Sequence, residues 1–307
     1  MIELGVQSPS GVHAAKIVEA IKTGIDGNYA PHHRESSSFI DAAGLKTQVF
    51  TLYWKGYEPY QQWIESRPNG WWHAAVPIGG NIGVFFERCK IRMMDTETSF
   101  SSRSPEGYAR IADCMSGPTD SHEYFGSIRD RIPRAQAESL VADRLPSLEG
   151  KCPLDAQGHL LTVRAPRNLC IIRSGQVYEE CDEEEEALYL SSTKPLLDHA
   201  MASLTNDGLD CGCLSNRYLR LENELGQPLK KTWSVSVWTS LDALMAWVKT
   251  EEHRRIFAAG MKHFRQSEMR GKTSGLKLWH EVAVLDEDQV FQYFNCHKKT
   301  GLLSTIF

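Results

Sequence analysis

The sequence lacks any apolar run long enough to cross a bilayer, which takes about 20 residues. It also lacks the charged start and apolar stretch of a secretory signal. Basic charge is not in excess, because the formal net charge is −5, and this argues against nucleic acid as the main partner. We therefore expect a cytoplasmic protein whose partners are neither membranes nor nucleic acids.

Cysteine is too sparse for a disulfide scaffold, because eight cysteines are scattered over 307 residues without regular spacing. Cys211 and Cys213 form a C-x-C pair, but no second pair stands at the spacing of a zinc ribbon. We therefore expect reduced thiols, with Cys211 and Cys213 buried at alternate positions of an apolar strand, because free cysteine is often a core residue.

Several common catalytic motifs are also absent. The sequence has no GxxxxGK[ST] phosphate loop, no HExxH zinc helix and no GxSxG nucleophile elbow. The glycine-rich stretch 78–83 lacks the strand and helix context of a dinucleotide site, so we interpret it as a turn. The chemistry must therefore be sought in isolated polar residues.

The C-terminal half has the clearer pattern of elements. The acidic run Glu179–Glu186 suits a helix start, where the helix dipole favours negative charge, and this helix is expected to reach Ser203. Thr239 or Ser240 is expected to cap another helix. The expected strands are Asn168–Arg173, Cys211–Leu221, Trp233–Trp238 and Leu276–Leu285, and the later helices are Leu241–Val248 and Glu252–Gln266. This β-α-β-β-α-β order is that of the split ferredoxin-like unit, in which the first and last strands are neighbours.

The N-terminal half has the pattern of a looser copy. We expect strands at Ile2–Gln7, Thr47–Trp54 and Ile91–Phe100, helices at His13–Thr23, Tyr60–Glu65 and Asn81–Cys89, and one short helix near Arg134–Asp143. The predicted fold is α+β, with duplicated ferredoxin-like units forming an antiparallel β-barrel of the dimeric-α/β-barrel type, flanked by helices. The halves are expected at residues 1–115 and 161–307, with 116–160 as the connection.

Polar residues that interrupt apolar strands are the candidate functional residues. Arg173 alternates with Leu169 and Ile171, and His280 alternates with apolar neighbours in 278–284. If these strands are neighbours, Arg173, His280 and the hydroxyl of Ser215 could converge on a small polar ligand. The alternative for each is a hydrogen-bonded core residue. His253 has Glu252 and Arg254 beside it, so the pattern alone favours a surface position.

Six blocks of sequence resemble the haem-containing aldoxime dehydratases. They occur in the family's order and cover most of residues 120–307, whereas the first half matches more weakly. The blocks are Tyr124–Pro133, Asn168–Gln176, Gly212–Tyr218, His253–Phe257, Leu276–Asp286 and Phe294–Leu303. The resemblance implies dehydration of an aldoxime, R–CH=N–OH, to a nitrile, with ferrous haem b as the cofactor.

The resemblance also assigns roles to single residues. His253 matches the family's proximal haem ligand, and His280 matches its distal catalytic histidine. Ser215 and Arg173 match the two residues that hold the substrate hydroxyl. The family also has a carboxylate ahead of the Tyr124–Pro133 block, for which Glu123 is the nearby candidate.

Two other functions remain open on the sequence. One is a haem peroxidase or oxygenase on a related scaffold, and the other is a haem-binding protein without catalytic activity. We also expect that the chain can form a homodimer. The sequence does not indicate whether an aromatic or an aliphatic aldoxime is preferred.

Overall fold

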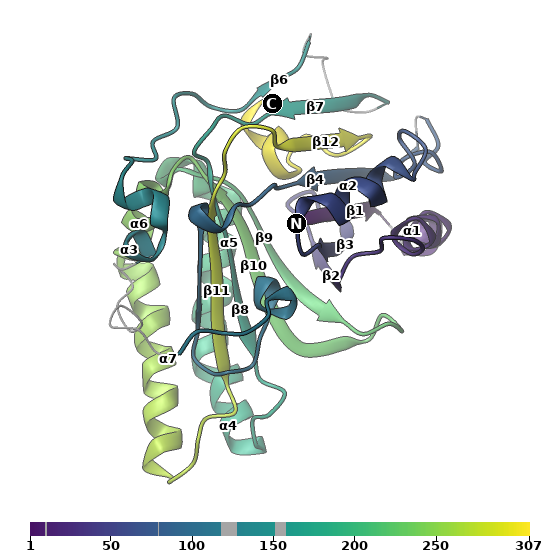
Figure 1. The fold of residues 1–307 in the computed structure, drawn as a ribbon. Helices are drawn as coiled ribbons and strands as arrows, with labels where there is room; N and C mark the ends of the chain where they lie inside the picture. Colours follow the sequence, from purple (N-terminus) through teal and green to yellow (C-terminus); the bar gives the residue numbers. More distant parts are fainter. Residues whose placement is uncertain (10, 79, 118–127, 151–157) are drawn as a thin grey trace.

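The computed structural model describes residues 1–9, 11–78, 80–117, 128–150 and 158–307. Glu123, Cys152 and the first part of the Tyr124–Pro133 block lie outside these residues. The strands of the C-terminal half stand beside those of the N-terminal half, and helices α4 to α7 cover the side away from the N-terminal half (Figure 1). Within the described residues, no helix is both long and apolar enough to span a membrane.

The described strands form one sheet in which every pairing is antiparallel. In chain order they are β1 (Ile2–Ser8), β2 (His33–Ile40), β3 (Lys46–Tyr53), β4 (Gly83–Arg88), β5 (Thr96–Phe100), β6 (Ser147–Leu148), β7 (Leu160–Arg164), β8 (Cys170–Val177), β9 (Cys213–Glu222), β10 (Pro228–Trp238), β11 (Lys277–Val284) and β12 (Val290–Phe294). Their order in space is β5-β11-β8-β10-β9-β2-β3-β1-β4-β12-β7-β6.

This strand order confirms the predicted pairing of the first and last strands of the C-terminal unit, and it shows that the two halves exchange edge strands. Strands β8 and β11, the first and last of the predicted C-terminal unit, are neighbours. The two halves also exchange edge strands, because β5 pairs with β11 while β12 and β7 extend the N-terminal strands beyond β4. The chain therefore crosses between the halves before and after the C-terminal unit.

The predicted closed barrel is wrong. Among the strands that the structure describes, β5 and β6 are the two edges of the sheet and do not pair with each other. The inner faces of the two halves instead share a core, in which Val49 and Phe85 belong to the same apolar cluster as Trp233 and Trp279. Two buried arginines, Arg173 and Arg217, also bridge the halves through glutamates.

The helices of the C-terminal half lie on the outer face of β8, β10 and β11. Their apolar side chains pack against Cys170, Val282 and Val284 of that face. The helical segments described are α1 (Gly11–Ile25), α2 (Tyr57–Glu65), η1 (Met93–Asp95), η2 (Gly107–Ile111), α3 (Ile128–Arg131), η4 (Pro133–Gln136), α4 (Glu183–Leu188), η5 (Tyr189–Thr193), α5 (Lys194–Asp207), η6 (Gly208–Cys211), α6 (Leu241–Val248), α7 (Glu251–Met269) and η7 (Gly301–Thr305).

Side-chain caps fix where three of these helices begin. Asp182 accepts a hydrogen bond from the backbone N–H of Glu185 at α4, and Ser240 accepts one from Ala243 at α6. Thr250 caps α7 by accepting from the N–H of His253. Ser240 is one of the two caps that the sequence predicts, and the start of α7 sets the position of His253.

Other local predictions are wrong. The segment predicted as a helix at Asn81–Cys89 contains strand β4, because its apolar residues are buried on both faces between β1 and β12. The predicted helix near Arg134–Asp143 is only the short turn η4. The cysteines among the described residues are free, as predicted, although Cys114 is exposed.

Candidate active site

His253 lies in the first turn of α7 and is partly buried. Its ring packs edge-on against Trp247, with 5.0 Å between the ring centroids. Burial, together with a smaller effect of the charge of His280, lowers the pKa of His253 to about 4. The imidazole is therefore neutral at physiological pH, which is the form that binds a metal ion.

His280 is presented by β11 and is held by a carboxylate. Its Nε2 lies 2.8 Å from Oε1 of Glu97, which is on the neighbouring strand β5. The other oxygen of Glu97 accepts from Nε of Arg131 at 2.7 Å. Burial raises the pKa of Glu97, but His280 and Arg131 outweigh this, so the pKa lies below its ordinary value. Glu97 is therefore an anion that can stabilise a protonated His280.

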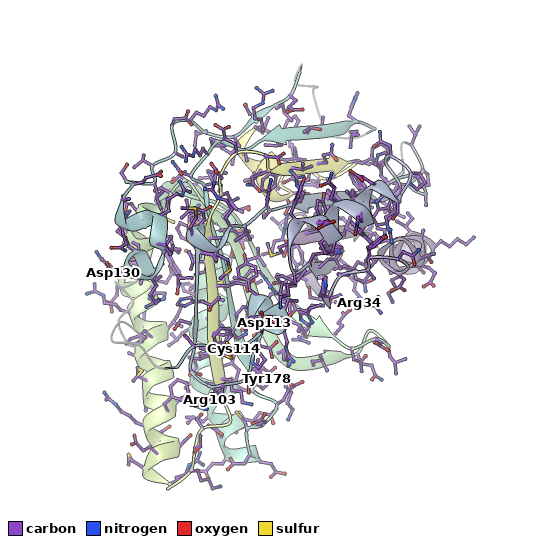
Figure 2. All side chains as sticks on the ribbon, in the orientation of Figure 1. Arg34, Arg103, Asp113, Cys114, Asp130 and Tyr178 are labelled. Atoms are coloured by element: carbon purple, nitrogen blue, oxygen red, sulfur yellow. The ribbon has the colours of Figure 1, made fainter. Side chains whose placement is uncertain are left out.

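Ser174 is the neighbour of His280 on the other side. The register of β11 and β8 sets His280 directly opposite Ser174, so the two side chains lie on the same face. Directly opposed residues in antiparallel strands have Cβ atoms roughly 5 Å apart. The site on the outer face of the sheet thus combines an imidazole, a carboxylate, a guanidinium and a hydroxyl. The short helix α3, which ends with Arg131, contacts β5; its Asp130 is labelled in Figure 2.

Arg173 does not belong to this group, so the predicted convergence of Arg173 with His280 is wrong. The register sets Arg173 opposite Glu281, one residue beyond His280 and therefore on the other face. Its guanidinium is buried and donates to Glu281 and to Glu35, each at 2.9 Å. The geometry gives Arg173 an ion-pairing position in the shared core.

Ser215 is also remote from His280. It lies on β9, opposite Val237 of β10, and β10 and β8 separate β9 from β11. Three strand spacings correspond to about 14 Å. The geometry therefore does not support a ligand shared by Ser215 and His280, and the predicted contacts of Ser215 and Arg173 with substrate stay predictions.

The family model for haem-containing dehydratases matches residues 3–302 of this chain. The chain belongs to this family. It is 32% identical to the aliphatic aldoxime dehydratase of Rhodococcus globerulus, over 97% of this chain and 82% of that protein. It is 26% identical to the phenylacetaldoxime dehydratase of Bacillus sp. (strain OxB-1), over 98% of this chain and 86% of that protein.

The fold agrees with the family assignment. A crystal structure of an aldoxime dehydratase in complex with butyraldoxime superposes with a TM-score of 0.90 at 31% identity, covering 99% of this chain and 84% of that one. A second aldoxime dehydratase structure gives a TM-score of 0.89 at 29% identity. The predicted resemblance is confirmed: this haem-containing dehydratase is an enzyme, and haem is its cofactor.

The residues on the outer face fit a haem. The neutral imidazole of His253 offers a nitrogen ligand for iron. Gly260 lies on the same side of α7, two turns after His253, and has no side chain. A Cβ atom added to Gly260 would lie 3.7 Å from Cδ1 of Leu278, the one contact within 4 Å among the described atoms, so this side of the helix is open. The main packing partners of α7 are α4, α5, α6 and η5 rather than a strand. This arrangement suits a flat macrocycle between α7 and β11.

Sequence reasoning missed three residues of this site. Arg131 and Ser174 stand inside two of the blocks that carry the family resemblance, whereas Glu97 stands in none of them, and no apolar alternation marks Glu97 or Ser174. Glu97 can be recognised as a site residue only in the folded structure, because its partners Arg131 and His280 are 34 and 183 residues away in sequence. Glu123 lies outside the described residues, and within them Glu97 provides a carboxylate that reaches His280.

Proposed function

We propose that this haem-containing dehydratase converts aldoximes, R–CH=N–OH, into nitriles and water. The observation that carries the proposal is the group formed by His280, Glu97 and Arg131 on the face covered by α7. Such a group can transfer protons to and from a small ligand. The names of the relatives support the substrate class, because they act on aliphatic aldoximes and on phenylacetaldoxime.

We propose that His253 of α7 would hold the haem iron and that His280 of β11 is the group that gives and takes protons at the substrate. Ferrous haem b, when bound, supplies an iron that can ligate the oxime nitrogen and weaken the N–O bond. Protonated His280 donates its proton to the oxime oxygen, the N–O bond breaks and the oxygen leaves as water. The neutral imidazole then accepts the proton from the oxime carbon, which completes the C≡N bond.

Ser174 and Arg131 are the proposed holders of the oxime hydroxyl, in place of Ser215 and Arg173. Ser174 shares the face and the register position of His280. Arg131 is fixed by Glu97 beside His280, and its positive charge can stabilise negative charge that develops on the leaving oxygen. Glu97 orients the imidazole, so it serves both the acid and the base form of His280.

The experiment is a turnover assay on haem-loaded protein, reduced under anaerobic conditions, with butyraldoxime and phenylacetaldoxime and with gas chromatography of the nitrile. We expect nitrile from at least one substrate, and we expect the His280→Ala variant to keep haem while turnover falls about 10²–10⁴-fold. His199→Ala is the matched control, because the His199 side chain is 81% exposed. Haem-bound wild-type protein that makes no nitrile, or His280→Ala with the activity of His199→Ala, contradicts the proposal.

We also propose that the two halves, 1–115 and 161–307, are duplicated ferredoxin-like units joined by 116–160. The strand order supports it, because β11-β8-β10-β9 and β4-β1-β3-β2 follow the same 4-1-3-2 pattern within their halves. The expected homodimer is likewise a proposal, and light scattering of the purified protein tests it.

A further inference from the structure

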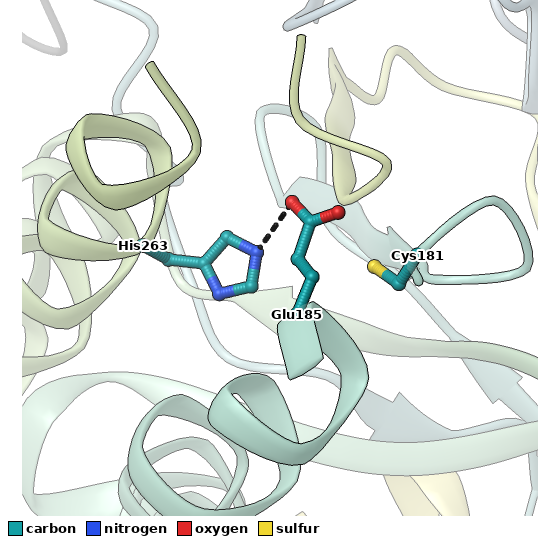
Figure 3. Close-up of side chains that lie close together, drawn as sticks. All are labelled: Cys181, Glu185 and His263. Carbon is teal, nitrogen blue, oxygen red and sulfur yellow. Dashed lines mark hydrogen bonds and ion pairs between the residues drawn. The ribbon is translucent and has the colours of Figure 1, made fainter. Parts of the chain in front are cut away.

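Glu185, in the first turn of α4, accepts hydrogen bonds from two elements that are distant in sequence. From α7, its Oε1 accepts from Nε2 of His263 at 3.0 Å (Figure 3). The same oxygen accepts from the hydroxyl of Ser267 at 2.9 Å. From the segment just before β11, it accepts from the hydroxyl of Ser274 and from the N–H of Gly275, which lies 2.9 Å from Oε2. We call these five residues the Glu185 cluster.

The Glu185 cluster is buried and its carboxylate is charged. Glu185 is 4% exposed and His263 is 1% exposed. Burial alone raises the pKa of Glu185, but the hydrogen bonds from Ser274, Gly275, Ser267 and His263 lower it to about 2. A buried carboxylate whose donors all come from neighbouring elements ties those elements together, because removing it leaves several donors unsatisfied.

Cys181 stands beside Glu185 and His263, so the group has the composition of a metal site. Without a metal, hydrogen bonds hold this group together. An ionised carboxylate only accepts, so Nε2 of His263 carries a proton that it donates to Glu185. Burial and the charge of Glu185 raise the pKa of Cys181 to about 12, so its sulfur is a thiol.

Gly275 shows how closely the elements are packed at this point. A Cβ on Gly275 would lie 2.2 Å from the backbone oxygen of Glu180, just before α4, so no larger residue fits without backbone movement. Two surface ion pairs cross the same junction, from Arg270 to Glu184 and from Lys272 to Asp182. The end of α7, the start of α4 and the approach to β11 therefore form one fixed junction.

The junction is at nearly equal distances from the two histidines. His263 is ten residues after His253 on α7, which corresponds to about 15 Å along a helix. Gly275 is five residues before His280, which corresponds to about 17 Å along a strand. A change of spacing at the junction therefore acts on both elements that carry the histidines.

We propose that Glu185 is a positioning residue that sets the separation of α7 from β11, and so of His253 from His280 across the haem. The proposal rests on the proposed roles of these two histidines. Glu185 touches neither haem nor substrate; it acts through the helix that carries one histidine and the strand that carries the other.

The test compares haem-loaded Glu185→Gln with Glu183→Gln. Glu183 is in the same helical turn, and its side chain is exposed. We expect Glu185→Gln to release haem to apomyoglobin about tenfold faster, to shift or broaden the iron–histidine stretch in ferrous resonance Raman spectra, and to lose about 10- to 100-fold in kcat with little change in KM. The Raman measurement reports only on folded, haem-bound molecules, so lower stability alone does not move it.

Ser267→Ala provides a second variant if Glu185→Gln does not fold. It removes a single donor of the cluster from α7, and we expect faster haem release in the same direction, by a smaller factor. Haem release, Raman spectrum and kcat equal to those of Glu183→Gln overturn the proposal. One equivalent of zinc in the purified protein, lost in both Glu185→Gln and Cys181→Ser, also overturns it. If wild-type protein binds haem but makes no nitrile, the proposed function fails, while haem release and the Raman spectrum still test Glu185.

Discussion

The imidazole of His280 and the carboxylate of Glu97 are 2.8 Å apart, between Nε2 and Oε1. They come from adjacent strands that are 183 residues apart in sequence, and Arg131 holds the other oxygen of Glu97. The carboxylate therefore fixes the ring and provides a counter-charge for its protonated form. This pairing supports the proposal that His280 both gives and takes a proton.

Glu97→Gln is expected to keep haem and to lower kcat about 10²-fold, because the amide neither neutralises the imidazolium nor fixes the ring as a carboxylate does. The measurement is the rate of nitrile formation by the haem-loaded variant and by wild type. An unchanged rate excludes this role for Glu97.

Ser174→Ala and Ser215→Ala test which serine holds the oxime hydroxyl. The strand register favours Ser174, whereas the family resemblance implies Ser215. Ser174 is opposite His280 on the neighbouring strand, so its loss is expected to lower kcat/KM about 10- to 100-fold, the cost of one or two hydrogen bonds to a charged group. Ser215→Ala is expected to stay near wild type. The opposite ranking would show that Ser215 holds the substrate, as the family resemblance implies.

Arg173→Met tests the position of Arg173 in the core. It leaves Glu35 and Glu281 without their shared cation, and breaking a buried ion pair in this way costs about 3–5 kcal/mol. We expect a loss of this size in urea unfolding, with most of it recovered when Glu35→Gln and Glu281→Gln are added. Lost turnover at unchanged stability would instead support the predicted contact of Arg173 with the substrate hydroxyl.

The sequence predicts the parts of this enzyme that depend on local pattern. It places β8, β9, β10 and β11 and the helices between them, because their apolar alternation and caps are strong, and it selects His253 and His280 through the family blocks. It does not predict strand register, and a shift of one residue moves a side chain to the other face. That is why Arg173 was expected beside His280 while its neighbour Ser174 has that position.

The N-terminal half shows the same limit in another form. Strand β2 was not predicted because its sequence, HRESSSFI, is largely polar, yet it joins the halves by pairing with β9. Its Glu35 is buried only because Arg173 reaches it from the other half. Such residues carry no local signal, since their environment is created by contacts between distant segments.

Glu281 is expected to make the stability of the enzyme fall as pH rises from about 5 to 7. Burial raises its pKa to about 7 from an ordinary value of 4.5, even though Arg173 acts in the other direction. Between these values the folded state holds a proton that the unfolded state has released, so the free energy of unfolding decreases with pH. Below the ordinary value both states are protonated and this contribution is complete.

Glu281→Gln removes this dependence. Relative to wild type, the variant should gain about 2–3 kcal/mol of unfolding free energy between pH 5 and pH 8, which is most of the effect of a pKa difference of about 2.5 at 1.36 kcal/mol for each pKa unit. Urea unfolding of haem-loaded protein at the two pH values measures it, with Glu183→Gln as the control. A constant difference between variant and wild type at both pH values would exclude the raised pKa.

The roles proposed for α7 and β11 are tested most directly by replacing His253 with glycine, which leaves a cavity that free imidazole can fill. In reduced His253→Gly, we predict loss of the wild-type Soret spectrum and of nitrile formation, and recovery of both when free imidazole takes the place of the missing side chain. A His253→Gly protein that keeps the wild-type ferrous spectrum without imidazole would show that another residue holds the iron, and that α7 and β11 do not face each other across the haem.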